Sequence, residues 1–293
     1  MSAVGASRPV TVDRGAEETV GALPPTPRKR RRWTRYILPV YSIGVLLYLL
    51  LPILVMILYG FNNSGFKRVS FRWQGFTIEW YKKLFAIPDL TNSLKNSLVV
   101  AVISTLIATV LGTMMALALV RYRFRAKGTS EFVMFLNIAA PEIVLGASLL
   151  SLFITFGIPR GMLTIIIAHV MFNIAFVTIT VRARLAGLDL TVEEAAKDLG
   201  ATPWVTFWKV TFPIIFPGIL AGALLAFALS IDDFIITNFV AGSTQTFPLW
   251  VYGTVKVGIP PQVFVMGTII FLVGVVIAIA NVIANRKAAP RAL

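Results

Sequence analysis

The sequence of 293 residues contains no cysteine and one histidine, His169. Without cysteine the chain has no disulfide framework, no thiolate metal ligands and no thiol chemistry. A single histidine argues against a histidine-based catalytic or zinc centre. The sequence also lacks a G-x-x-x-x-G-K-[ST] pattern and any Gly-Lys dipeptide, so it has no phosphate-binding loop for ATP hydrolysis. We therefore predict neither catalytic residues nor a metal site.

Charged residues are also scarce. They make up 14% of the chain and apolar residues 57%, whereas soluble domains have about 25% and about 45–50%. A mean hydropathy of +0.81 and several apolar runs of about 20 residues match the hydrocarbon thickness of a bilayer. The few charges are unbalanced, because 27 Lys and Arg residues face 13 Asp and Glu residues, for a net charge of +14.

Six apolar runs are long enough to be membrane-spanning helices. They cover residues 36–61, 97–120, 133–156, 163–181, 214–240 and 265–284. The third and fifth contain carboxylates, so a strict hydropathy criterion would leave four or five spans. We keep six because the flanking charges then form a consistent pattern. The sequence predicts an all-α membrane protein.

The distribution of basic residues predicts the orientation of these spans. Nineteen of the 27 Lys and Arg residues fall in segments on one side, including both termini, and eight on the other. By the positive-inside rule, both termini are cytoplasmic. Residues 1–35 are predicted to be a disordered basic tail, residues 36–285 the membrane domain and residues 286–293 a second tail. We interpret the basic run 28–35 as an anchor that contacts anionic lipid rather than nucleic acid.

The cytoplasmic loop at about 190–212 has the pattern of a helix–turn–helix unit. Thr191 is a predicted N-cap with two glutamates in the first turn, where the helix dipole favours them. Gly200 is predicted to end this helix, and Thr202 followed by Pro203 to start a second. The apolar surface of such a loop indicates that it packs against something.

The same loop resembles the EAA motif of binding-protein-dependent ABC import permeases. The matching residues are Glu194-Ala195-Ala196, then Gly200 after three intervening residues, then Val210-Thr211-Phe212-Pro213 after nine more. Val210 and Phe212 replace the usual isoleucine and leucine. The resemblance implies that Glu194, Ala195, Ala196, Gly200 and Pro213 belong to coupling helices that dock on an ATPase. Glu194 would orient the loop or pair with a basic group on the ATPase, and Gly200 would supply the turn.

The resemblance extends over the chain from about residue 36. Five segments are similar to the second permease of spermidine/putrescine-type importers. They are WYKKLF, NSLKNSLVVAVIST, PEIV, LSIDDFIITNFVAG and PLWVYGTVKVGIPPQV. It implies a type I ABC importer permease fold in a bacterial cytoplasmic membrane and polyamine import by alternating access. The implied partners are a homologous permease, two ATPase subunits that bind ATP and magnesium, and an extracytoplasmic solute-binding protein.

Three carboxylates lie inside predicted spans, where a charge is costly unless it faces a cavity or a partner. They are Glu142, Asp232 and Asp233. We predict that they line a pathway for a cation. On a straight helix Glu142 would lie near mid-depth, about 14 Å from the cytoplasmic end. Alternatively, it bonds the backbone freed by Pro141 or is protonated. Asp232 and Asp233 would lie about 100° apart, so one is expected to face another interface.

Other polar and aromatic residues are weaker pathway candidates. His169 and Asn173 are spaced i and i+4, which favours a buried hydrogen-bonded pair and leaves a pathway role for Asn173 open. Trp250 and Tyr252, with Phe247, could stack on an amine or belong to the interfacial aromatic belt.

Two other functions remain open. The chain could be an ABC permease for an amino acid, iron or an anion, although intramembrane carboxylates count against anions. It could also be a self-sufficient secondary transporter, against which the EAA spacing argues.

Overall fold

The computed structural model describes residues 34–64, 72–189 and 191–288. The regular elements within them are helices, together with one isolated antiparallel bridge between Asn62 and Phe76. The helices are α1 (Thr34–Tyr59), α2 (Glu79–Lys82), α3 (Pro88–Arg121), α4 (Lys127–Ala139), α5 (Glu142–Thr155), α6 (Met162–Ala186), α7 (Thr191–Asp198), α8 (Pro203–Thr206), a π-helical turn (Phe207–Thr211), α9 (Phe212–Asp232), α10 (Ile235–Val240), α11 (Phe247–Val255) and α12 (Pro261–Ala288). The predicted all-α class is confirmed. Almost all of the predicted tail 1–35, and residues 289–293, lie outside the described residues.

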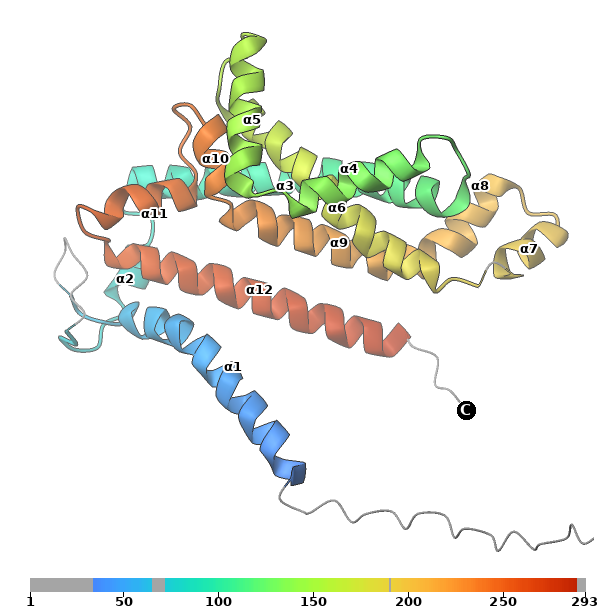
Figure 1. Ribbon diagram of the computed structural model, residues 1–293. Coiled ribbons are helices and arrows are strands. Elements are labelled where there is room, and N and C mark those ends of the chain that lie inside the picture. The colour runs from blue at the N-terminus through green and yellow to red at the C-terminus, as the bar shows by residue number, and fades with distance from the viewer. Residues whose placement is uncertain (1–33, 65–71, 190, 289–293) are drawn as a thin grey trace, which may run out of the picture. The chain divides into compact units, whose positions relative to one another are not determined.

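The chain divides into two compact units at Pro52, inside α1. The first unit, residues 1–52, contains the N-terminal part of α1. The second, residues 53–293, contains the end of α1 and every later helix (Figure 1). The sites described below all lie in the second unit.

Among the described residues, five helical segments are long and apolar enough to cross a membrane. They are Tyr36–Tyr59, Pro88–Arg121, Met162–Ala186, Pro203–Asp232 and Pro261–Ala280. A sixth crossing results if α4 and α5 are counted as one broken span. With this broken span counted, the number of crossings agrees with the six spans predicted from the sequence. The segments Pro88–Arg121 and Pro203–Asp232 begin earlier than the predicted spans 97–120 and 214–240, because their helices continue past the apolar runs.

The third predicted span is not a straight helix. α4 and α5 meet at an angle of 110°, with the break at Ala140 and Pro141 (Figure 1). Proline donates no backbone hydrogen bond and disfavours helical geometry at the preceding residue. Ala140 accordingly takes extended dihedrals, φ −69° and ψ 137°. The depth of Glu142 calculated along a straight helix is therefore wrong, because Glu142 is the first residue of α5.

The fifth predicted span is also interrupted. α9 ends at Asp232, Asp233 is extended with φ −61° and ψ 121°, and α10 starts at Ile235. The expectation that the two aspartates lie 100° apart on one helix is therefore wrong. Both interrupted spans break beside carboxylates.

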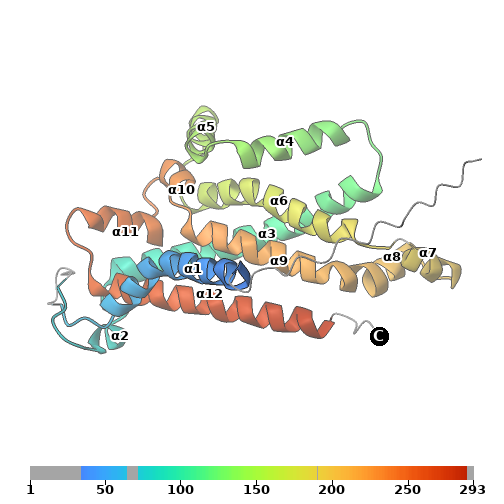
Figure 2. The ribbon, with the colours of Figure 1, turned by 60° about the horizontal axis from the view of Figure 1, so that its bottom comes forward.

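Helices α3, α6 and α9 form the centre of the second unit and run side by side (Figure 2). Small residues allow their close approach. At Gly112 of α3, a Cβ atom would lie 2.8 Å from the Cβ of Val177 on α6. Val177 also lies against Gly222 of α9, where a Cβ atom would be 3.4 Å from its Cα. This three-helix core connects the loop at about 190–212 at one end with the helix breaks at the other.

Candidate functional site

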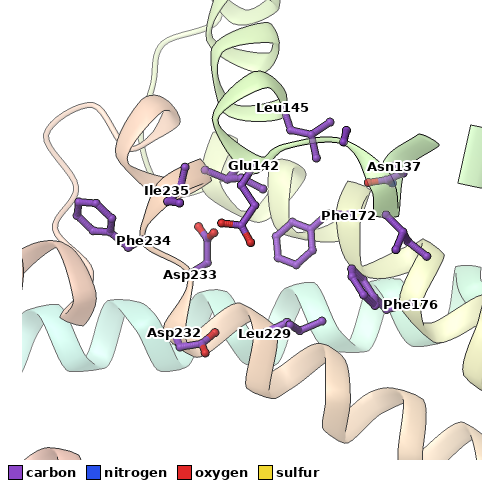
Figure 3. A pocket seen from close by; sticks show the side chains of 13 residues that line it. Asn137, Glu142, Leu145, Phe172, Phe176, Leu229, Asp232, Asp233, Phe234 and Ile235 are labelled. Atoms are coloured by element: carbon purple, nitrogen blue, oxygen red, sulfur yellow. The ribbon is translucent and has the colours of Figure 1, made fainter. Parts of the chain in front are cut away.

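The three predicted pathway carboxylates come together around one cavity of about 470 Å³. Its walls are the ends of α4 and α9, the starts of α5 and α10, and Phe172 and Phe176 of α6. Figure 3 shows the carboxylate of Glu142 facing Asp233, with Asp232 at the end of α9. Residues 90 positions apart meet here because each span is interrupted at its carboxylates. Free backbone groups at such breaks are tolerated in a membrane where they line a cavity.

Asp233 is held firmly by its neighbours. Its Oδ2 accepts hydrogen bonds from the backbone N of Thr237 at 2.8 Å and from Thr237 Oγ1 at 2.6 Å. The same oxygen lies 3.3 Å from Nε2 of His169. The side chain of Asp233 is only 7% exposed. Asp233 therefore stabilises the start of α10, in the manner of a helix-capping carboxylate.

A buried chain of polar side chains continues from Asp233 into the three-helix core. His169 Nε2 is 2.9 Å from Thr237 Oγ1, and His169 Nδ1 is 2.5 Å from Ser230 Oγ. Ser230 Oγ is in turn 3.0 Å from Ser104 Oγ. This row of hydrogen-bonded side chains links α10, α6, α9 and α3. Because buried polar groups require partners, each member fixes the position of the next.

The predicted pair between His169 and Asn173 is wrong. His169 bonds to α9 and α10 instead, and the amide of Asn173 makes no hydrogen bond among the described residues although Asn173 is fully buried. Sequence spacing on α6 placed both residues on one face but did not include the hydroxyl groups of α9 and α10. Asn173 is not among the residues that line the cavity.

Asp232 and Glu142 differ from Asp233 in that both are exposed. Asp232 also borders a second cavity of about 450 Å³ between α9, α11 and α12. Tyr252 lines this second cavity, and its ring centre lies 4.6 Å from that of Phe234. Trp250 packs against the buried cluster around Leu90 and lines neither cavity. Of the three predicted aromatic residues, Tyr252 and Phe247 border this second cavity together with Asp232, and Trp250 does not.

The loop at about 190–212 forms the predicted helix–turn–helix unit. α7 ends before Gly200, whose φ of +84° is left-handed and suits glycine. The side chain of Thr202 caps α8 by accepting a hydrogen bond from the backbone N of Val205. Thr191, however, is the first residue of α7 and not its cap. Its backbone N donates to Asp189, and this hydrogen bond lowers the pKa of the Asp189 carboxyl.

The motif residues of this loop are mostly exposed. Glu194, Ala195, Gly200 and Pro213 are exposed, and Ala196 is half-buried. Beside them lie two large apolar side chains, Leu199 at 90% exposure and Trp204 at 70%. An exposed apolar surface beside a loop of this kind is typical of a protein interface.

Sequence reasoning missed the role of the neighbouring Glu193. Its buried carboxylate pairs with Arg121 at the end of α3 and accepts a hydrogen bond from Thr211 Oγ1 at 2.7 Å. Arg121 Nη2 also donates to Thr211 Oγ1 at 3.2 Å. The only sequence signal was the presence of two adjacent glutamates, which point about 100° apart on a helix and therefore do not share one face. The sequence did not indicate which one faces inward.

A helical membrane unit with an exposed loop at one end and a carboxylate-lined cavity at breaks in its spans has the features of a transport permease. Residues 108–289 match the model of the family described as "Binding-protein-dependent transport system inner membrane component", and the chain belongs to this family. It is thus a multi-pass inner-membrane protein.

Two characterised relatives are similar over most of the chain. The spermidine/putrescine transport system permease protein PotC of Escherichia coli (strain K12) is 38% identical over 242 residues, which are 82% of this chain and 90% of that protein. The putrescine transport system permease protein PotI of the same strain is 39% identical over 238 residues, 78% of this chain and 84% of that protein.

Solved structures show the same fold. A bacterial ABC transporter involved in the import of the acidic polysaccharide alginate matches with a TM-score of 0.68 at 15% identity, covering 88% of this chain and 96% of that one. The MetNI methionine ABC transporter matches with a TM-score of 0.55 at 16% identity, covering 73% and 100%. The predicted type I ABC importer permease fold is thereby confirmed.

Proposed function

We propose that this chain is the transmembrane permease subunit of an ATP-driven ABC importer that moves polyamines such as spermidine and putrescine into the cell. The observation that carries the proposal is the meeting of Glu142, Asp232 and Asp233 at one cavity, in a chain similar to spermidine/putrescine permeases. The chain is a transport subunit, and ATP hydrolysis resides on a separate subunit.

The lining of the cavity suits a polyamine, which alternates ammonium groups with short alkyl segments. Carboxylates supply charge-assisted hydrogen bonds to an ammonium group. Phe172 and Phe176 supply apolar surface for methylene groups and ring faces for a cation. Asp232 and Glu142 are exposed, so both are available to a solute, whereas Asp233 is engaged with Thr237 and His169. We therefore assign solute contact to the first two and a supporting role to Asp233.

The chain works with other permease, ATPase and binding-protein subunits. We propose two ATPase subunits that hold ATP and magnesium, and a homologous permease that completes the pathway. The exposed surface of Glu194, Leu199 and Trp204 would dock on an ATPase, and alternating access would follow from its movement. We further propose that both termini are cytoplasmic, because 19 of the 27 basic residues then lie on the cytoplasmic side.

The test is reconstitution of the chain with its permease, ATPase and binding-protein partners in proteoliposomes. Uptake of labelled spermidine should require ATP and should be competed by putrescine but not by amino acids or anionic sugars. Replacing Glu194 with alanine should reduce both binding of the ATPase and uptake. Uptake driven by an ion gradient through this chain alone would refute the proposal, and so would ATP-dependent uptake of a solute other than a polyamine.

A further inference from the structure

The cytoplasmic loop is tied to the membrane helices at one point by a closed set of three side chains. Glu193 of α7 pairs with Arg121 of α3, both contact the hydroxyl of Thr211, and Thr211 directly precedes α9. In the sequence, Arg121 is 72 positions and Thr211 is 18 positions from Glu193. Three elements distant in the sequence therefore share one group of polar contacts.

The burial of this group makes it costlier to break than an ordinary surface ion pair. The side chain of Glu193 is 8% exposed and that of Arg121 is 27% exposed. Removing one member of such a pair leaves the other charge partly buried and unpaired. By contrast, the ion pair between Glu131 and Arg182 at 2.8 Å is 35% and 41% exposed, and pairs of that kind contribute little.

The three residues are well placed to transmit movement. Arg121 is the last residue of α3, and Thr211 is the last before α9, whose 21 residues span about 30 Å and end at Asp232. α3 and α9 are joined a second time by Ser104 and Ser230 near the cavity. A displacement of α7 that is carried through Glu193 would therefore move two helices that are already linked a second time, from the middle of α3 to the end of α9.

We propose that Glu193, Arg121 and Thr211 form a cytoplasmic latch that fixes α7 to α3 and α9, so that movement of the docked loop becomes movement of the spans instead of bending of the loop. Glu193 is a positioning residue that faces inward, whereas Glu194 on the exposed side is the docking residue. The latch sets how much solute moves for each ATP hydrolysed, and in this respect it rests on the proposed function.

The variant Glu193→Gln keeps the shape of the side chain and an acceptor for Thr211 but removes the charge. In the reconstituted importer we expect normal subunit assembly, retained ATP hydrolysis and about a tenfold fall in spermidine moved per ATP, within the usual range of coupling between sites. The matched control Glu131→Gln should leave this ratio unchanged. An unchanged ratio in Glu193→Gln, with wild-type uptake intact, would overturn the latch.

A double-mutant cycle separates coupling from simple damage. If Glu193 and Arg121 act as one unit, Arg121→Gln added to Glu193→Gln should lower the ratio no further, whereas independent effects would multiply. Multiplying effects would refute the latch.

A measurement without solute distinguishes failure of the latch from failure of the proposed function. Amide hydrogen exchange in α7 should become about tenfold faster in Glu193→Gln and stay unchanged in Glu131→Gln, because the latch holds α7 against the spans. Unchanged exchange in α7 would overturn the latch whatever the solute. If α7 loses protection as expected but the wild-type importer moves no polyamine, the proposed function is wrong and the latch stands.

Discussion

Replacing Asp233 with alanine is expected to destabilise the protein by about 2–4 kcal/mol, and replacing Asp232 by about 0.5 kcal/mol or less. Asp233 accepts two hydrogen bonds from Thr237 and lies 3.3 Å from His169. Loss of a capping side chain costs about 0.5–2 kcal/mol. Each buried donor left without a partner adds about 1–3 kcal/mol. Asp232 is exposed, and substitutions of exposed residues usually change stability little.

For transport the order of the two residues should be reversed, with replacement of Asp232 impairing uptake more directly than it impairs stability. If Asp232 contacts an ammonium group of the solute, its loss removes about 1.5–3 kcal/mol of charge-assisted hydrogen bonding. At 1.4 kcal/mol per factor of ten, KM for spermidine should rise about tenfold or more. The more conservative variant Asp233→Asn keeps an acceptor for Thr237 and should lose less stability than Asp233→Ala.

Two assays on the same preparations test this division of roles. Thermal unfolding of the purified complex should show a clear loss of stability only for Asp233→Ala, and uptake kinetics should show a raised KM with a near-normal unfolding midpoint for Asp232→Ala. Equal loss of stability in both alanine variants would refute the reasoning. A normal KM in Asp232→Ala would remove that residue from the solute site.

Two further predictions concern glycines. Gly112→Ala should destabilise the chain by about 1–2 kcal/mol in a thermal unfolding assay, because the new methyl group would lie 2.8 Å from Val177. The control Gly274→Ala should be neutral or stabilising, because no neighbouring atom lies within 4 Å of the new methyl group. Equal effects of the two would contradict the packing argument. Gly200→Ala should reduce ATP-coupled uptake with little loss of overall stability, because its φ of +84° strains a residue with a Cβ by about 1–2 kcal/mol in the docking loop. Uptake and ATPase binding that remain at wild-type levels would show that the turn tolerates this strain.

Much of the architecture was predictable because it depends on local patterns. Apolar run length predicted the spans, the left-handed turn at Gly200 followed from the missing Cβ, and Thr202 with Pro203 marked the start of α8. The carboxylates in the spans were recognisable because isolated charge in an apolar run is costly. These features need only the sequence within one element.

The errors arose where an element responds to distant neighbours. Asn173 was expected to pair with His169, but the hydroxyls of Ser230 and Thr237 on other helices bind the imidazole instead. The breaks at Pro141 and Asp233 redirect α5 and α10, which a straight-helix calculation ignores. No local pattern describes contacts between residues more than 60 positions apart.

The sequence by itself determined that this protein is an apolar, basic, multi-span chain without cysteine or a nucleotide-binding loop, because composition and run length decide where a segment is stable. Only the tertiary structure decided how the scarce carboxylates divide their roles. It engages Asp233 in a buried polar chain, leaves Asp232 and Glu142 exposed beside a cavity, and turns Glu193 inward while Glu194 faces outward. The reason is physical, since the cost of a charge depends on which partners the fold brings within hydrogen-bonding distance.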